Sequence, residues 1–126
     1  MTPKIVWLKR LLLAKSLTCL FIWGLPALVG PPAFLALFGI SMPADPIYLR
    51  IFGAMATALA LLYWFAYQDP IRNSAIIKYA IFDNGLSTLT VIGVAIVSGL
   101  SSWFFYVSGA MTAFFTIAFY VLRPKE

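Results

Sequence analysis

The sequence contains no histidine and only one cysteine, Cys19. Histidine is the commonest protein ligand of metals and haem and the commonest acid–base group near neutral pH. One cysteine allows neither an internal disulfide nor a two-cysteine redox or metal motif. We therefore expect no metal ligand and no cofactor-binding residue, so any cofactor nearby would be held by a neighbouring protein.

Acidic residues are also scarce. The four acids lie in four different places, and only Asp83 falls within a long apolar stretch. No pair of a nucleophile and a base can be assembled from such a distribution. We therefore predict no catalytic residue, and an enzyme that acts on lipid is disfavoured.

Charge of either sign is low, whereas apolar residues are in excess. Of 126 residues, 10% are charged, 63% hydrophobic and 17% aromatic, against about 25% charged and 45–50% apolar in a soluble domain. A helix needs about 20 apolar residues to cross the membrane, and four stretches qualify: 5–25, 47–67, 75–97 and 103–122. The sequence predicts an all-α integral membrane protein, a compact bundle of four transmembrane helices in one domain, 1–126. A short interfacial segment, 33–40, is expected between the first two helices.

Two breaks between these stretches have a clear local chemistry. Pro26 lacks an amide donor, so we expect it to end or kink the first helix. The turn from Asp69 to Ser74 contains Pro70, and Asn73 or Ser74 is expected to cap the third helix by accepting from its free amides.

Basic residues predict the orientation. Eight of the nine lie near the start of the chain, around the 69–74 turn or after 122, and Arg50 is the exception. Because basic residues concentrate on the cytoplasmic side, we expect both termini to be cytoplasmic, in a bacterial inner membrane. The net charge of +5 then reflects topology and contact with anionic membrane lipids. Nucleic acid is not expected as a partner.

Asp83 and Lys15 are charges placed inside apolar stretches. At 1.5 Å per residue they lie about 13 Å and about 10 Å from the same membrane face. Asp83 belongs to a polar stripe with Ser87 and Thr90. It could relay protons or cations or contact a substrate, although a structural tie between helices is the commoner role of such residues. Lys15 could either pair with Asp83 or extend its ammonium to the interface.

Arg50 lies near the opposite face of the membrane and shares a helix face with small residues. Its guanidinium could bind an anion or a lipid head group, or it could anchor the helix through Asp45 or loop carbonyls. Small residues at four-residue spacing favour close helix packing. The residues that we expect at such contacts are Gly53, Ala54, Thr57, Gly109 and Ala113.

Several short motifs resemble a known group of proteins. They are Gly24-Leu25-Pro26, Arg50 with Gly53, the aromatic run 63–67, and the turn 69–73. Together they resemble the small bacterial four-span membrane proteins called BphX-like and, more distantly, DoxX-like. The resemblance implies a four-helix bundle in a bacterial inner membrane, and it implies no activity and no catalytic residue.

Two functions are compatible with these observations. The favoured one is a non-catalytic accessory or structural subunit of a larger membrane complex, such as a respiratory or photosynthetic assembly, with other membrane subunits as partners. The alternative is a small homo-oligomeric transporter or channel that uses Asp83.

Overall fold

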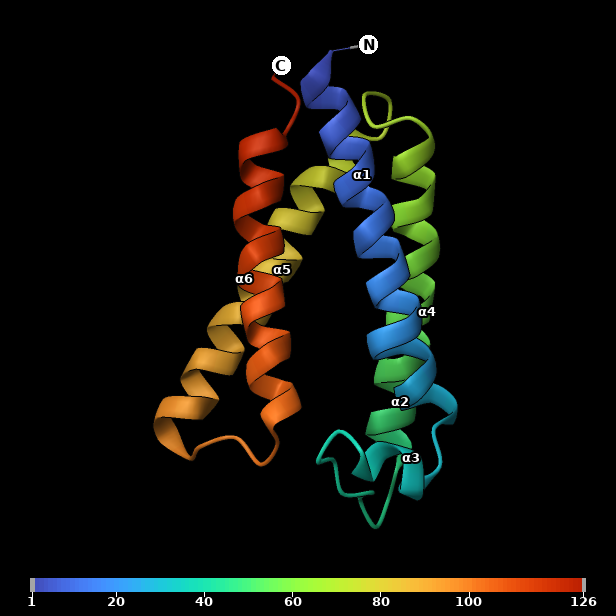
Figure 1. Cartoon of the computed structure of the whole chain (residues 1–126), viewed down its shortest axis with the longest axis vertical. Helices are drawn as coiled ribbons and strands as arrows, with labels where there is room; N and C mark the ends of the chain where they lie inside the picture. The colour runs from blue at the N-terminus through green and yellow to red at the C-terminus, as the bar shows by residue number, and fades with distance from the viewer. Residues whose placement is uncertain (1, 126) are drawn as a thin grey trace.

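The computed structural model describes residues 2–125 and is helical, with no strand in that range. Four candidate membrane spans cover Pro3–Val29, Ile47–Gln68, Ser74–Val97 and Trp103–Leu122. They pack together as an all-α four-helix bundle (Figure 1). The protein is therefore a membrane protein of the predicted fold class.

The first span is longer than the sequence predicted and consists of three pieces. These are α1 (Pro3–Thr18), the π-helix η1 (Cys19–Gly24) and α2 (Leu25–Val29). Pro26 was expected to end or kink the helix, and it does not end it, since the helix continues to Val29. Pro26 cannot donate a backbone hydrogen bond, and the wider π-helical turn directly precedes it. The helix instead ends at the sequence Gly30-Pro31-Pro32, where Gly30 is extended.

The other three spans lie close to their predicted limits. They are α4 (Ile47–Gln68), α5 (Ser74–Val97) and α6 (Trp103–Leu122). The expected interfacial segment contains the short helix α3 (Pro32–Ala36). Ser102 is the N-cap residue of α6, and its hydroxyl accepts from the Phe104 amide and donates to the Phe38 carbonyl. This bond joins the α6 start to the chain after α3.

The prediction that Asn73 or Ser74 caps α5 through its side chain is wrong. Asn73 is the N-cap residue, but its side chain makes no cap hydrogen bond. Its amide instead donates backwards, to the carbonyls of Asp69 at 2.9 Å and Phe65 at 3.3 Å. The side chain therefore bonds to carbonyls at the end of α4, where the last helical turn leaves carbonyls without partners inside the helix; the Asp69 carbonyl also accepts from the Asn73 backbone amide at 3.1 Å.

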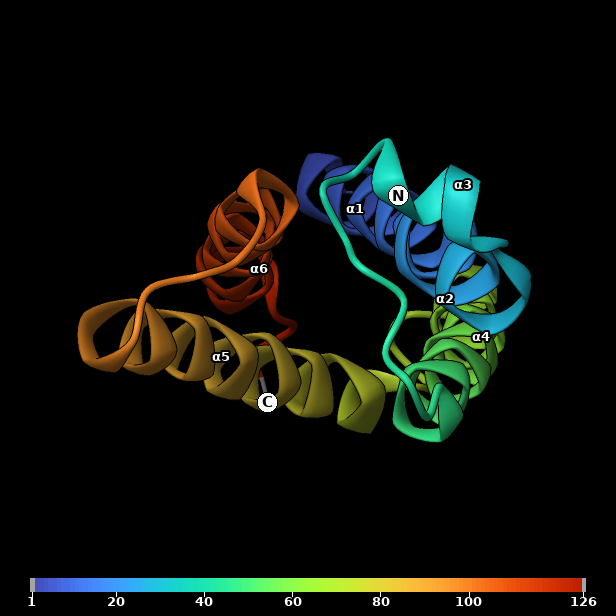
Figure 2. The same cartoon turned by 90° about the horizontal axis from the view of Figure 1, so that it is seen from below.

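The spans are arranged as two pairs. The first span packs mainly on α4, whereas α5 packs mainly on α6. Consecutive helices α4 and α5 contact each other much less than either contacts its main partner. In Figures 1 and 2, α5 starts beside α4 and diverges from it toward the 98–102 loop. The two pairs thus converge at one end and separate toward the other.

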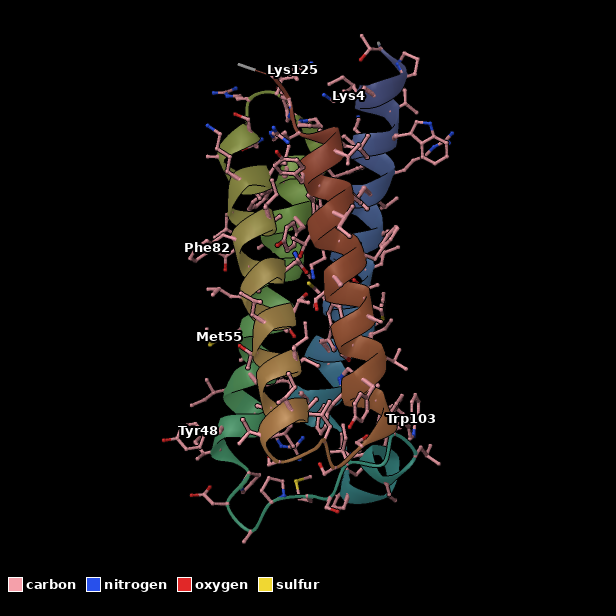
Figure 3. All side chains as sticks on the ribbon, turned by 90° about the vertical axis from the view of Figure 1, so that its left-hand side faces the viewer. Lys4, Tyr48, Met55, Phe82, Trp103 and Lys125 are labelled. Carbon is pink, nitrogen blue, oxygen red and sulfur yellow. The ribbon has the colours of Figure 1, made fainter. Side chains whose placement is uncertain are left out.

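The end where the pairs converge also carries both termini and the 69–73 turn (Figure 1). Lys4 and Lys125 lie there, opposite Tyr48 and Trp103 (Figure 3). The three segments that hold eight of the nine basic residues therefore lie at one end of the bundle.

We call this end the packed half. It holds the side chains with 0% exposure that fill the core: Leu8, Leu12, Tyr63, Ala66, Ile77, Ala80 and Phe119. The opposite part of the bundle, which contains the start of α4, the end of α5 and the start of α6, is the open half.

Candidate functional site

Lys15 is the most deeply buried charge in the described part of the chain. Its side chain is 3% exposed, so the ammonium does not reach the interface. Its Nζ donates to the Oδ1 of Asn84 on α5 at 2.7 Å. The hydrogen-bond partner of Lys15 is therefore the neighbour of Asp83, which is neither of the two arrangements that the sequence suggested.

Aromatic rings complete the surroundings of the ammonium. The Lys15 Nζ lies 4.6 Å from the centre of the Trp23 ring, 4.7 Å from that of Phe115 and 5.8 Å from that of Tyr63. The electron-rich faces of aromatic rings attract cations within about 6 Å. These three rings and Asn84 stabilise a charge that would be costly in the membrane interior.

The π-helix helps to build this cage. It places Trp23 so that its indole Nε1 donates to the Ser108 hydroxyl of α6 at 2.9 Å, while the ring faces Lys15. π-Helical turns occur frequently at functional sites. Sequence reasoning missed Trp23, because nothing in the sequence marks a π turn apart from the nearby Pro26.

Asn84 is 0% exposed and makes two hydrogen bonds. It accepts from Lys15 and donates from its Nδ2 to the Ala80 carbonyl at 2.8 Å. The sequence placed Asn84 only beside the polar stripe of Asp83. Neighbouring helical residues point about 100° apart, so rotation of α5 decides which of the two faces Lys15.

Asp83 is partly buried and far less constrained. Its carboxylate Oδ2 accepts a hydrogen bond from the Tyr63 hydroxyl, at the long distance of 3.4 Å. Hydrogen bonds to carboxylates are normally 2.5–2.7 Å for a hydroxyl donor. The carboxylate is therefore available for further hydrogen bonds.

A cavity of about 410 Å³ lies between the two helix pairs. Lys15, Asp83 and Asn84 contribute to its lining, together with the hydroxyl residues Ser87, Thr90, Ser108 and Thr112. Trp23, Phe52, Phe104 and Phe105 form much of the remaining wall. The expected polar stripe of α5 therefore lines a cavity inside the bundle.

Further side-chain bonds join the helices around the cavity. Thr88 on α5 and Thr112 on α6 share a hydrogen bond of 2.9 Å. Ser16 on α1 donates to the Ala60 carbonyl of α4 at 2.7 Å. With the Lys15–Asn84 bond, these contacts tie all four spans together, as polar groups commonly do in membranes.

Arg50 lies outside the cavity lining. Its guanidinium donates to the carbonyls of Gly30 at 2.9 Å and Ala27 at 3.2 Å. Asp45, which was considered as its partner, accepts instead from the Ile47 amide at 3.1 Å. Arg50 therefore ties the start of α4 to the end of α2.

The predicted packing residues divide into two groups. A Cβ at Gly53 would lie 2.2 Å from the Leu28 amide nitrogen, and one at Gly109 would lie 2.6 Å from Val91, so these glycines permit close helix contacts. Thr57 lies against Gly24 and donates to the Gly53 carbonyl at 2.7 Å. Ala113 is half-buried and Ala54 is exposed.

The outward face of α5 is a second feature of interest. Only Ile77, Ala80 and Asn84 are buried along this helix. The residues that line its outer face at helical spacing, all exposed, are Phe82, Leu86, Leu89, Gly93 and Ile96. A Cβ at Gly93 would meet no atom within 4 Å.

The side chains that line the cavity can form hydrogen bonds and electrostatic interactions, and they are not arranged for covalent chemistry. In residues 2–125 no group of three cysteine or acidic side chains is placed to hold a metal ion. Cys19 is buried and lines the cavity as a free thiol.

Comparisons with protein-family models, curated proteins and solved structures give no match.

Proposed function

We propose that the chain is a non-catalytic accessory or structural subunit of a larger membrane complex, of a respiratory, photosynthetic or similar energy-transducing kind. The observation that carries this proposal is the uncovered face of α5. In the most apolar stretch of α5, 11% of the residues are buried, whereas in that of the first span 39% of the residues are buried. α5 thus contributes little to the core of its own bundle.

Exposure of apolar side chains alone does not require a protein partner, because lipid accepts them. Gly93 and Thr90 add a different feature, since both are exposed one helical turn apart. Small and hydroxyl residues allow backbones of membrane helices to approach closely and to form hydrogen bonds. This surface therefore suits a helix of another subunit.

The resemblance to BphX-like and DoxX-like proteins supports a bacterial inner membrane as the location. The common end of the three basic segments supports an orientation with both termini in the cytoplasm. Anionic lipid head groups would be the other neighbours of this end.

A bulky residue at Gly93 tests the subunit proposal. Gly93→Phe should leave the isolated chain folded, because the position has open space around it. It should also block a partner helix at this face. After gentle detergent extraction, native gels should show the wild-type chain in a large assembly and Gly93→Phe outside it.

Ala110→Phe provides the matched control, because Ala110 is an exposed small residue on α6. It should remain in the assembly. Wild-type migration only as a free monomer or homodimer would contradict the proposal, as would normal assembly of Gly93→Phe.

The cavity favours a second candidate, a small homo-oligomeric transporter or channel that uses Asp83. The carboxylate lines the cavity with one long hydrogen bond. In vesicles with a trapped pH indicator, purified protein should then conduct protons under a membrane potential. Asp83→Asn should reduce the flux at least about tenfold, the effect of roughly one lost charged hydrogen bond.

Asp69→Asn is the control for this experiment, because it removes a carboxylate exposed in the turn. It should leave proton flux unchanged. Equal flux from vesicles with wild-type protein and with Asp83→Asn would eliminate the transport mechanism.

A further inference from the structure

We infer that the cavity beside Lys15 and Asp83 binds an uncharged membrane-dissolved molecule that carries a hydroxyl group, such as a long-chain alcohol. This binding site goes beyond a role in assembly and does not depend on transport. The size of the cavity, its opening, its charge balance and its free hydrogen-bonding groups each contribute to the inference.

The cavity has the size and the walls of a ligand site. Its volume of about 410 Å³ lies within the roughly 300–1,000 Å³ that is typical of small-molecule pockets. A smaller apolar cavity of about 100 Å³ shares Trp23, Phe52, Phe104 and Phe105 with it. Apolar side chains therefore separate the two cavities and also line much of the larger one, so that part of a hydrocarbon chain can lie against them.

The opening of the cavity faces the membrane. Its lining includes Phe52 on α4 and Leu86 and Thr90 on α5, and all three are exposed on the surface of the bundle. Phe52 belongs to the first half of α4 and the other two to the second half of α5, and Figures 1 and 2 show α5 diverging from α4 toward the 98–102 loop. A molecule dissolved in the bilayer can therefore enter sideways, without crossing an aqueous phase.

Charge balance selects for an uncharged guest. Lys15 supplies one positive and Asp83 one negative charge in their ordinary ionised forms, so the two charges sum to zero. A guest with one net charge would add an uncompensated charge to a low-dielectric site, which is costly. A neutral guest adds none.

The free hydrogen-bonding groups of the cavity are acceptors, so they favour a guest that donates a hydrogen bond. Ser87 and Thr90 donate their hydroxyl protons to the carbonyls of Asp83 and Leu86, at 2.9 and 2.8 Å. Lys15 is directed at Asn84 and at the rings that surround it. The Asp83 carboxylate and the hydroxyl lone pairs remain as acceptors. A guest hydroxyl supplies the proton that these acceptors can bind.

Photo-crosslinking in lipid nanodiscs tests this inference with three probes. A fatty alcohol, a fatty acid and an alkylamine of equal chain length each carry the same diazirine near the polar group. Mass spectrometry of the purified full chain then locates the labelled residues. The alcohol should label inner cavity residues such as Trp23 and Phe104 about tenfold more than the acid or the amine, which corresponds to one charged hydrogen bond or its loss.

Two variants should reverse this preference in opposite directions. Asp83→Asn leaves the charge of Lys15 uncompensated, so the acid should gain about tenfold relative to the alcohol. Lys15→Met leaves the charge of Asp83 uncompensated, so the amine should gain. Asp83→Asn keeps the shape of the side chain, so the test remains decisive if Lys15→Met does not fold.

Asp69→Asn and Lys9→Met are the matched controls, because both residues lie outside the cavity lining. They should keep the wild-type order of the three probes. Best labelling of the wild-type cavity by the acid or the amine would overturn the inference. So would the same probe order in both charge variants, or alcohol labelling confined to lipid-facing residues such as Phe82 and Met55.

Discussion

The packed half and the open half use the same four helices in different ways. In the packed half, large side chains such as Tyr63 and Phe119 are fully buried, and their rings stack with centres 6.2 Å apart. In the open half, Phe52 on α4 and Val97 on α5 are 53% and 85% exposed. The bundle is therefore held at one end, and a polar layer at Lys15 and Asn84 separates its packed core from a cavity.

The difference follows from what drives helix association in lipid. Apolar surface gains little by leaving lipid for protein, so close packing and polar bonds must hold membrane helices together. In the packed half all four spans supply interlocking large side chains. In the open half, small residues join each pair internally, at Gly53 and Gly109, and nothing comparable joins α4 to α5.

The largest effect is expected at the boundary between the halves. Asn84→Leu removes the hydrogen-bond acceptor of a buried ammonium, which should lower the free energy of unfolding by about 2–3 kcal/mol. Titration with a denaturing detergent in mixed micelles measures this change.

The double variant Lys15→Met/Asn84→Leu sharpens that result. Because it removes the charge as well as its partner, it should be more stable than Asn84→Leu alone. Equal destabilisation by the single and the double variant would show that the Lys15–Asn84 bond does not hold the boundary.

A pair of leucine truncations compares the halves directly. Leu12→Ala in the packed half leaves a cavity at a side chain with 0% exposure, which should cost about 2 kcal/mol. Leu89→Ala on α5, where the side chain is 66% exposed to lipid, should change the free energy of unfolding by less than about 0.5 kcal/mol. Similar losses in the same unfolding assay would mean that the two halves pack alike.

The smallest effect is expected for the bond between η1 and α6. Trp23→Phe removes the indole donor to Ser108 but keeps a ring over Lys15. A double-mutant cycle with Ser108→Ala should give a coupling of about 0.6–1 kcal/mol, as for other hydrogen bonds between membrane helices. A coupling energy of zero would show that the hydrogen bond between Trp23 and Ser108 does not stabilise the open half.

The sequence predicted the spans well because their length and polarity are set by the membrane. The last span, 103–122, agrees with α6 residue for residue. The first span exceeds its prediction because a π turn lets the helix pass Pro26, and local sequence rules treat proline as a break. Asn73 does occupy the N-cap position of α5, but the direction of its side-chain bonds was mispredicted because its short amide can bond either way along the chain.

The site was only partly predictable. Depth along a helix can be counted, so the sequence placed Lys15 and Asp83 near one level. Rotation about the helix axis depends on tertiary packing, and this is why Asn84, and not Asp83, receives the Lys15 hydrogen bond. The cavity could not be predicted at all, because it arises from the divergence of two helix pairs.

That divergence is the central claim, and the separation of spin labels on α4 and α5 tests it most directly. With Cys19→Ser as background, one pair of cysteines replaces Phe65 and Tyr79 in the packed half, and another replaces Tyr48 and Ile96 in the open half; all four side chains are exposed. Pulsed electron paramagnetic resonance in nanodiscs should give a clearly longer distance for the open-half pair. Equal distances, or a shorter one for the open-half pair, would contradict the account, because the helices would then run side by side and leave no cavity between them.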